Sequence, residues 1–244
     1  MTQVDVWHGS LVVSSEKLAE LKNILSSDEL ARSDRFKFAI HRDRYIVARA
    51  YLRCFLADYT GIPAPEICFT YSDRGKPAIA NLAFTLSRTS SASLHFNLSH
   101  SEDLAIYCFA TSYLVGVDLE YLLKKIDCDR IAERFFSQQE AKLIQNLPEK
   151  QKKQTFFQLW TAKEAYLKAT GEGLVGGLDN VEIAIDSLGK SKIITTNKQK
   201  NTNHNWYLHC FQPQVNFLAT VATQKQPENL SIQELEPDTF PRVK

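Results

Sequence analysis

The sequence predicts an α+β protein built from two similar halves. Helical and strand-like patterns follow one another twice along the 244 residues. The segment "AYLR" at 50–53 returns as "AYLK" at 165–168, an offset near 115 residues. The pair Leu104-Ala105 returns as Leu218-Ala219 at almost the same offset. Matches separated by about half of the chain length are what an internal duplication produces.

The first half is expected to cover residues 1–112. Its main helix is predicted over about 26–59 with a break near Ser33, because "YIVARAYLRCFLADYTG" has helical apolar spacing and stops at Gly61. The segments "ICFTYS" and "LAIYCFA" are predicted strands, and "FNLSHS" is interpreted as the turn before the second of them.

The second half is expected to cover residues 113–226. It begins with the strand "YLVGVDLE", and Ser137 with Glu140 then forms the pattern of a capping box. A helix over about 153–170 ends at Gly171. The segments "VEIAID", "SKIITT", "NWYLHCF" and "FLATVAT" are predicted strands, and residues 227–244 are expected to form a polar tail on the surface.

Composition excludes some partners. The 29 Lys and Arg balance the 28 Asp and Glu to a net charge of +1, so no general field draws the protein to nucleic acid or to a membrane. No segment has a signal-peptide pattern or the roughly 20 apolar residues of a membrane span, and we expect a cytoplasmic protein. The five cysteines lack a close pair and are interpreted as free thiols.

The segment "GVDLE", 116–120, holds two carboxylates close together. Side chains of a strand alternate between its faces, so Asp118 and Glu120 share the face of Gly116, opposite Val117 and Leu119. Two like charges at this spacing either face water or are neutralised by a cation.

The segment "LWTAKEAYLKATGEGL", 159–174, offers matching groups on a helix. Trp160, Glu164 and Lys168 lie at i, i+4 and i+8, and share one side of it. Alone, Glu164 and Lys168 are typical of an exposed helix pair, and Trp160 of core packing. Together with Asp118 and Glu120, Glu164 can complete the oxygen ligands that Mg²⁺ prefers, with substrate phosphates in its other positions.

These motifs resemble the signature of the 4′-phosphopantetheinyl transferases, and more narrowly of the surfactin-synthetase-activating, or Sfp-type, subgroup. "GVDLE" is followed some forty residues later by "WTAKEAYLKATGEGL". The segments "RGKPAI", "FNLSHS" and "RFFSQQE" extend the resemblance over roughly residues 30–175. The resemblance implies a pseudo-twofold fold of two α+β halves. It also implies transfer of the phosphopantetheine arm of coenzyme A to a serine of an apo carrier protein, with release of adenosine 3′,5′-bisphosphate.

The resemblance also implies residue roles. Asp118, Glu120 and Glu164 would bind Mg²⁺ beside the coenzyme A diphosphate, and Lys168 would add a fixed positive charge there. Glu164 would also be the general base for the carrier serine. Ser99 and His100 would lie at the 3′-phosphate of coenzyme A. The remaining residues expected to bind coenzyme A are Arg32, Arg35, Arg44, Arg74, Gly75, Lys76, Pro77 and Lys163.

The expected partner is an acyl, polyketide or peptidyl carrier protein, whose recognition helix is acidic. The segment "YLLKKIDCDRIAERFF" combines apolar and basic groups directly after the "GVDLE" strand. The residues expected to dock the carrier are Leu122, Leu123, Lys124, Lys125 and Arg130. By analogy, a fused enzyme of two halves is expected to be a monomer.

Three alternatives compete with this interpretation. A magnesium phosphodiesterase or nuclease would use the same carboxylates to hydrolyse phosphate esters. A module that binds carrier proteins without catalysis would keep the fold, although intact Asp118, Glu120, Glu164 and Lys168 argue against it. A serine hydrolase built on Ser99 and His100 is disfavoured, because adjacent side chains of an extended chain point apart and no G-x-S-x-G segment exists.

Overall fold

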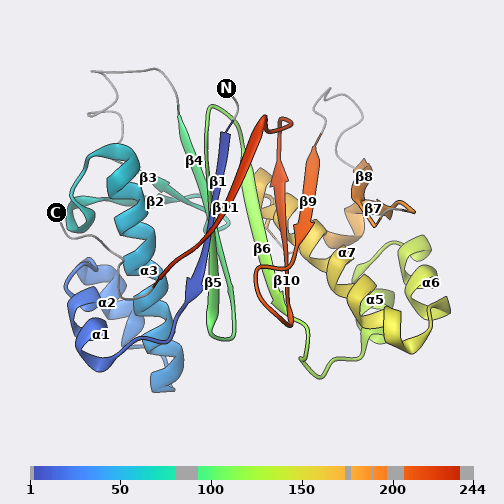
Figure 1. Ribbon diagram of the computed structural model, residues 1–244, viewed down its shortest axis with the longest axis horizontal. Coiled ribbons are helices and arrows are strands. Elements are labelled where there is room, and N and C mark those ends of the chain that lie inside the picture. The colour runs from blue at the N-terminus through green and yellow to red at the C-terminus, as the bar shows by residue number, and fades with distance from the viewer. Residues whose placement is uncertain (1–2, 81–92, 174–176, 188, 197–205, 237–244) are drawn as a thin grey trace.

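The computed structural model describes residues 3–80, 93–173, 177–187, 189–196 and 206–236 of the chain. Two sheets meet in the middle of the molecule, and each carries its helices on its outer side (Figure 1). The described elements of the N-terminal half are β1 (Gln3–Ser10), α1 (Ser15–Lys22), α2 (Ser27–Ser33), α3 (Ala39–Thr60), η1 (Ala64–Glu66), β2 (Phe69–Tyr71), β3 (Pro77–Ile79), β4 (Leu94–Ser101) and β5 (Leu104–Thr111). Those that follow are β6 (Val115–Tyr121), α5 (Cys128–Phe135), α6 (Gln138–Asn146), α7 (Glu149–Thr170), η2 (Leu178–Asn180), β7 (Val181–Ile185), β8 (Ser191–Thr196), β9 (Tyr207–Phe211), β10 (Phe217–Thr223) and β11 (Asn229–Glu234).

Each half places a 22-residue helix against its sheet. The N-terminal sheet has the strand order β11-β1-β5-β4 and the C-terminal sheet the order β6-β10-β9. Helix α3 ends at Gly61 and helix α7 at Gly171, both in the left-handed conformation that glycine adopts without a steric penalty. The repeated "AYLR" and "AYLK" fall on these two helices, and the repeated Leu-Ala pairs on β5 and β10. The prediction of two similar α+β halves is confirmed.

Each half has its own apolar core, and a third apolar cluster fills the space between the two sheets. It combines Val4 and Val6 of β1 with Val115, Val117 and Leu119 of β6. The odd-numbered residues of β6 therefore face the N-terminal sheet, as the strand alternation predicts. Its even-numbered residues face α7, where the carboxylates lie.

The segment after residue 226 corrects one expectation. It is not only a surface tail, because Asn229–Glu234 forms β11 and pairs in parallel with β1. Leu235, 4% exposed, joins the core of the N-terminal half. Gly9 accommodates it, since a Cβ atom at Gly9 would lie 2.6 Å from Cβ of Leu235. The chain thus returns from the second half to the sheet of the first.

The "FNLSHS" segment corrects a second expectation. It is not a turn, because it forms the C-terminal part of β4 and pairs antiparallel with β5. The hairpin turn follows at Glu102, which adopts a positive φ of 51°. None of the helices in the described ranges is both long and apolar enough to cross a membrane.

Candidate active site between the two halves

The backbone of β6 lies directly on α7. At Gly116 an added Cβ atom would lie 2.2 Å from the carbonyl oxygen of Ala165 and 2.5 Å from the amide nitrogen of Ala169. Both obstacles are backbone atoms of the helix and cannot rotate away. The glycine of "GVDLE" therefore sets the close approach that brings Asp118 and Glu120 beside Glu164 and Lys168.

A row of polar side chains on β4 connects the halves. Asn97 accepts a hydrogen bond from the Val117 amide with its Oδ1 at 2.9 Å, and Ser99 Oγ donates to Asp118 Oδ1 at 3.0 Å. Ser101 Oγ donates to Glu120 Oε2 at 3.1 Å. These three residues alternate along β4 and so share its face toward β6. The N-terminal half thereby orients both carboxylates of the C-terminal half.

Lys168 forms an ion pair with Asp118. Its Nζ lies 2.6 Å from Asp118 Oδ1 and 3.0 Å from Ser99 Oγ. Burial alone would lower the pKa of Lys168, but the charge of Asp118 and the hydrogen bond to it outweigh burial and raise this pKa. Lys168 is therefore a fixed cation at the junction of the halves.

Glu164 is buried beside these charges and is 5% exposed. Burial first, and then the negative charges of Asp118 and Glu120, raise its pKa to about 7, although Lys168 opposes the shift. The three carboxylates thus repel one another in the metal-free protein. A divalent cation would relieve this repulsion.

The carboxylate oxygens of this cluster are of the chemical type that Mg²⁺ binds, but the three carboxylates are not arranged as a complete metal site. Among the described residues no hydrogen-bond partner reaches the buried Oδ2 of Asp118, so this oxygen has a free acceptor. Carboxylate oxygens are the ligands that Mg²⁺ takes. Within the same residues, however, no three acidic, His or Cys side chains converge as a finished metal site. Glu120 is paired with Lys124, whose Nζ lies 2.5 Å from Glu120 Oε2.

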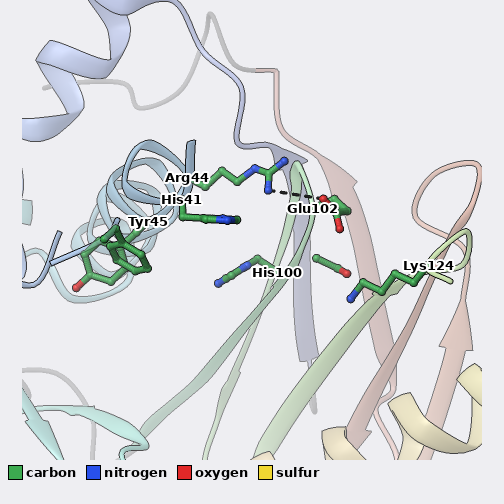
Figure 2. Close-up of a pocket in the computed structure, with 8 residues that line it drawn as sticks. His41, Arg44, Tyr45, His100, Glu102 and Lys124 are labelled. Carbon is green, nitrogen blue, oxygen red and sulfur yellow. Dashed lines mark ion pairs between the residues drawn. The ribbon is translucent and has the colours of Figure 1, made fainter. Parts of the chain in front are cut away.

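A pocket of about 290 Å³ lies next to the carboxylates. His100 and Arg44, both expected to bind coenzyme A, line it together (Figure 2). Partial burial, followed by the positive charges of Lys168, Arg44, Lys124 and His41, lowers the pKa of His100. The full lining is Phe36, His41, Arg44, Tyr45, His100, Ser101, Glu102 and Lys124. This concentration of cations favours an anionic ligand.

Arg32 and Arg35 lie elsewhere. They line a second pocket, of about 530 Å³, with Asp28 and Phe36. Phe36 lines both pockets, so the second is adjacent to the first. The Arg32 guanidinium also lies 5.6 Å from the ring centroid of Tyr45, which lines the pocket of His100 and Arg44, so Arg32 and Arg35 are next to that pocket without lining it.

The "RGKP" turn packs on the end of α7. Lys76 Nζ donates to the carbonyl of Ala169 at 2.6 Å, and the Arg74 side chain lies against Gly173. Gly75 has a φ of 81°, which the turn requires, and Pro77 begins β3. Burial lowers the pKa of Lys76. The turn thus brings two basic residues of the N-terminal half to the C-terminal end of α7.

Lys163 is bound inside the core of the C-terminal half. Its side chain is fully buried, and its Nζ lies 2.7 Å from Glu140 Oε2. It also donates to the carbonyls of Leu178 and Val181. Neighbouring positions on a helix face different directions, so Lys163 points into the core while Glu164 faces β6. We assign Lys163 to the structure of this half and not to cofactor binding.

The residues expected to dock a carrier protein lie between β6 and α5. Four of them precede helix α5, which begins at Cys128, and Arg130 lies in its first turn. Leu123 is 56% exposed, Lys125 and Arg130 are exposed, and Leu122 is half-buried against the C-terminal core. Lys124 instead turns to Glu120 and to the pocket.

Asn97, Ser101 and Glu140 were not among the predicted functional residues. Asn97 and Ser101 share the period of two with Ser99, so polar alternation within "FNLSHS" could have found them had it been interpreted as a strand. Glu140 is recognisable as the partner of Ser137 in a capping box, but its bond to Lys163 joins residues 23 positions apart and has no local signal.

Comparisons with known proteins identify the family of the chain. Residues 12–112 match the family model "4′-phosphopantetheinyl transferase, N-terminal", and residues 114–222 match the model of the 4′-phosphopantetheinyl transferase superfamily. The 4′-phosphopantetheinyl transferase HetI of Nostoc sp. is 39% identical over 90% of this chain and 87% of its own length. The 4′-phosphopantetheinyl transferase Sfp of Bacillus subtilis is 26% identical over 74% of this chain and 75% of its own length.

A solved structure is similar to part of the chain. It is a holo-(acyl-carrier-protein) synthase from Bacillus anthracis in complex with CoA (3′,5′-ADP), 22% identical, with a TM-score of 0.35. The match covers 45% of this chain and 93% of that one. The two family models and the identity with HetI carry the assignment: the chain belongs to the 4′-phosphopantetheinyl transferase superfamily and is a transferase of the Sfp type.

Proposed function

We propose that this enzyme transfers the 4′-phosphopantetheine arm of coenzyme A to a serine of apo carrier proteins, that it requires Mg²⁺, and that it releases adenosine 3′,5′-bisphosphate. The observation that carries the proposal is the cluster of Asp118, Glu164 and Lys168 at the junction of the halves. Its three charges lie beside a cationic pocket, as a phosphorylated substrate requires.

Asp118, Glu120 and Glu164 would hold the Mg²⁺ ion. When bound, the ion would neutralise the diphosphate and stabilise the charge that develops on the leaving group. Two observations support this set of ligands. Asp118 Oδ2 has no hydrogen-bond donor among the described residues, and the raised pKa of Glu164 shows that its negative charge is poorly compensated. Glu120 would have to leave Lys124 to join it.

The residues of the chain itself would do the rest. Lys168 would hold a diphosphate oxygen, since its position is fixed by Asp118 and Ser99. His100 and Arg44 would bind the 3′-phosphate, while Lys76 and Arg74 would lie near the adenine end. Arg32 and Arg35 stay candidates for an outer phosphate contact from the neighbouring pocket.

In the reaction one oxygen–phosphorus bond forms and another breaks. The carrier serine oxygen bonds to the phosphorus that bears the pantetheine arm, the bond from this phosphorus to the bridging oxygen breaks, and the bisphosphate leaves. Glu164, with a pKa of about 7 in the metal-free protein, is the group of the cluster best suited to accept the serine proton. The loop with Leu122, Leu123 and Lys125, together with Arg130 of α5, would receive the acidic helix of the carrier. We also propose a monomer located in the cytoplasm.

Intact-mass spectrometry tests this function. An apo acyl carrier protein is incubated with the enzyme, coenzyme A and Mg²⁺, and the nucleotide product is identified by chromatography. We expect the carrier to gain one phosphopantetheine arm with one equivalent of adenosine 3′,5′-bisphosphate, and to gain nothing with chelator or when its serine is replaced by alanine. Release of nucleotide with no modified acyl, peptidyl or polyketide carrier would instead indicate a phosphohydrolase.

A further inference from the structure

Lys124 connects the carboxylate cluster with the pocket of His100. It follows β6, and its Nζ lies 2.5 Å from Glu120 Oε2. The same side chain lines the pocket of about 290 Å³. In Figure 2 Lys124 reaches the pocket from the side opposite Arg44 and His41, with His100 between them. One cation is therefore within reach of two different anionic partners.

Glu120 Oε2 is engaged by two donors, Lys124 Nζ and Ser101 Oγ. Ser101 Oγ donates to the same Oε2, and Ser101 itself accepts a hydrogen bond from the Tyr121 amide at 3.1 Å. Asp118 has an oxygen without a partner among the described residues, whereas Glu120 Oε2 has two donors. A cation that takes up Glu120 must therefore compete with Lys124.

The other basic residues of the pocket have different surroundings from Lys124. Arg44 lies 2.6 Å from Asp103 and 3.7 Å from Glu102, both on the turn after β4. Burial and the positive charges of Lys168, Arg44, Lys124 and His41 lower the pKa of His100. Lys124 is 35% exposed and sits on a flexible four-carbon stem, which lets its charge move without a backbone change.

We propose that Lys124 is a positioning residue that exchanges partners. It holds Glu120 while the carboxylates bind no cation, and it turns to an anion in the pocket of His100 and Arg44 once a divalent cation has taken Glu120. This inference rests on the proposed metal site. Because binding couplings are reciprocal, the cation then strengthens anion binding and the anion strengthens cation binding by the same factor.

Calorimetry measures this coupling directly. Mg²⁺ is titrated into the full chain with and without saturating adenosine 3′,5′-bisphosphate, a probe with two phosphate groups but no diphosphate. The variants are Lys124→Met and, as matched control, Lys142→Met on the exposed side of α6. Thermal melts verify that each variant is folded.

We expect the nucleotide to tighten Mg²⁺ binding about tenfold in the wild type and in Lys142→Met, but less than about threefold in Lys124→Met. Lys124→Met should also bind Mg²⁺ more tightly without nucleotide, since Glu120 is released. Any direct contact between nucleotide and metal is common to all three proteins and cancels in the comparison.

Equal coupling in Lys124→Met and the wild type would overturn the inference, even if both affinities changed, because loss of a nearby charge alone changes affinities without changing their coupling. Transfer to a carrier measured in parallel separates the two proposals. If the wild-type enzyme transfers the arm and the coupling between Mg²⁺ and nucleotide binding is unaltered in Lys124→Met, only the role of Lys124 is refuted. Absence of both Mg²⁺ binding and transfer refutes the proposed function itself.

Discussion

At the residue scale, the site is a small set of charges held under mutual repulsion. Glu164 shows this most clearly, because burial and the charges of Asp118 and Glu120 raise its pKa to about 7. That Glu164 and Lys168 share one side of a helix could be predicted from their spacing, whereas their place beside "GVDLE" was a hypothesis from metal-ligand chemistry and from the family resemblance. The roles of Lys163 and Ser101 could not be predicted in this way. Adjacent residues of one motif point in different directions, and the contacts of each side chain depend on how the elements pack.

Glu164→Gln tests the repulsion through its pH dependence. The folded-state pKa of Glu164 lies above its ordinary value of 4.5, so the protonated form stabilises the metal-free fold below pH 4.5, and this stability is lost as the pH rises toward 7. We expect Glu164→Gln to be more stable than the wild type by about 3 kcal/mol at pH 8 and about equal at pH 4.5.

Urea unfolding in chelator at both pH values measures this difference. Glu133→Gln, at an exposed position of α5, is the matched control and should leave stability unchanged within about 0.5 kcal/mol. A Glu164→Gln curve that parallels the wild type from pH 4.5 to 8 would show that Glu164 carries no unfavourable charge.

At the element scale, the approach of β6 to α7 assembles the site. The sequence predicted both elements and the end of α7 at Gly171, because each has a local signal, but α7 begins at Glu149 and not at about 153. It did not predict that "FNLSHS" continues as a strand. Asn97, Ser99 and Ser101 are polar since they face β6 of the other half, and this partner lies about 20 residues further along the chain.

Gly116→Ala tests the close approach. Its Cβ atom would collide with helix backbone at Ala165 and Ala169, so β6 and α7 would have to separate. We expect a loss of more than about 2 kcal/mol in the free energy of unfolding. Fluorescence-detected denaturation measures it, and near wild-type stability would mean that the two backbones are less tightly packed than described.

At the scale of the whole molecule, the two halves form one unit. An apolar cluster lies between their sheets, the β4 side chains reach across to β6, and β11 returns to pair with β1. The repeated segments predicted the two halves. The return of β11 had no local signal, because "NLSIQE" is half polar and its partner β1 is more than 220 residues away.

Leu235→Ala tests this return. Leu235 is 4% exposed in the core of the first half, whereas Ile232 on β11 is 41% exposed. We expect Leu235→Ala to lower the free energy of unfolding by about 2–3 kcal/mol. The control Ile232→Ala should lower it by less than about 1 kcal/mol. Equal effects in chemical denaturation would mean that β11 does not anchor the C-terminal half to the first sheet.

The most direct test of the account is the rate at which an apo carrier protein gains mass in the presence of coenzyme A and Mg²⁺, compared between wild type, Lys168→Met and Lys142→Met. The cluster at the junction should be the centre of transfer, so we expect a loss of at least about 100-fold in Lys168→Met, at unchanged fold, and wild-type rates in Lys142→Met. A folded Lys168→Met enzyme that transfers the arm at the wild-type rate would contradict it.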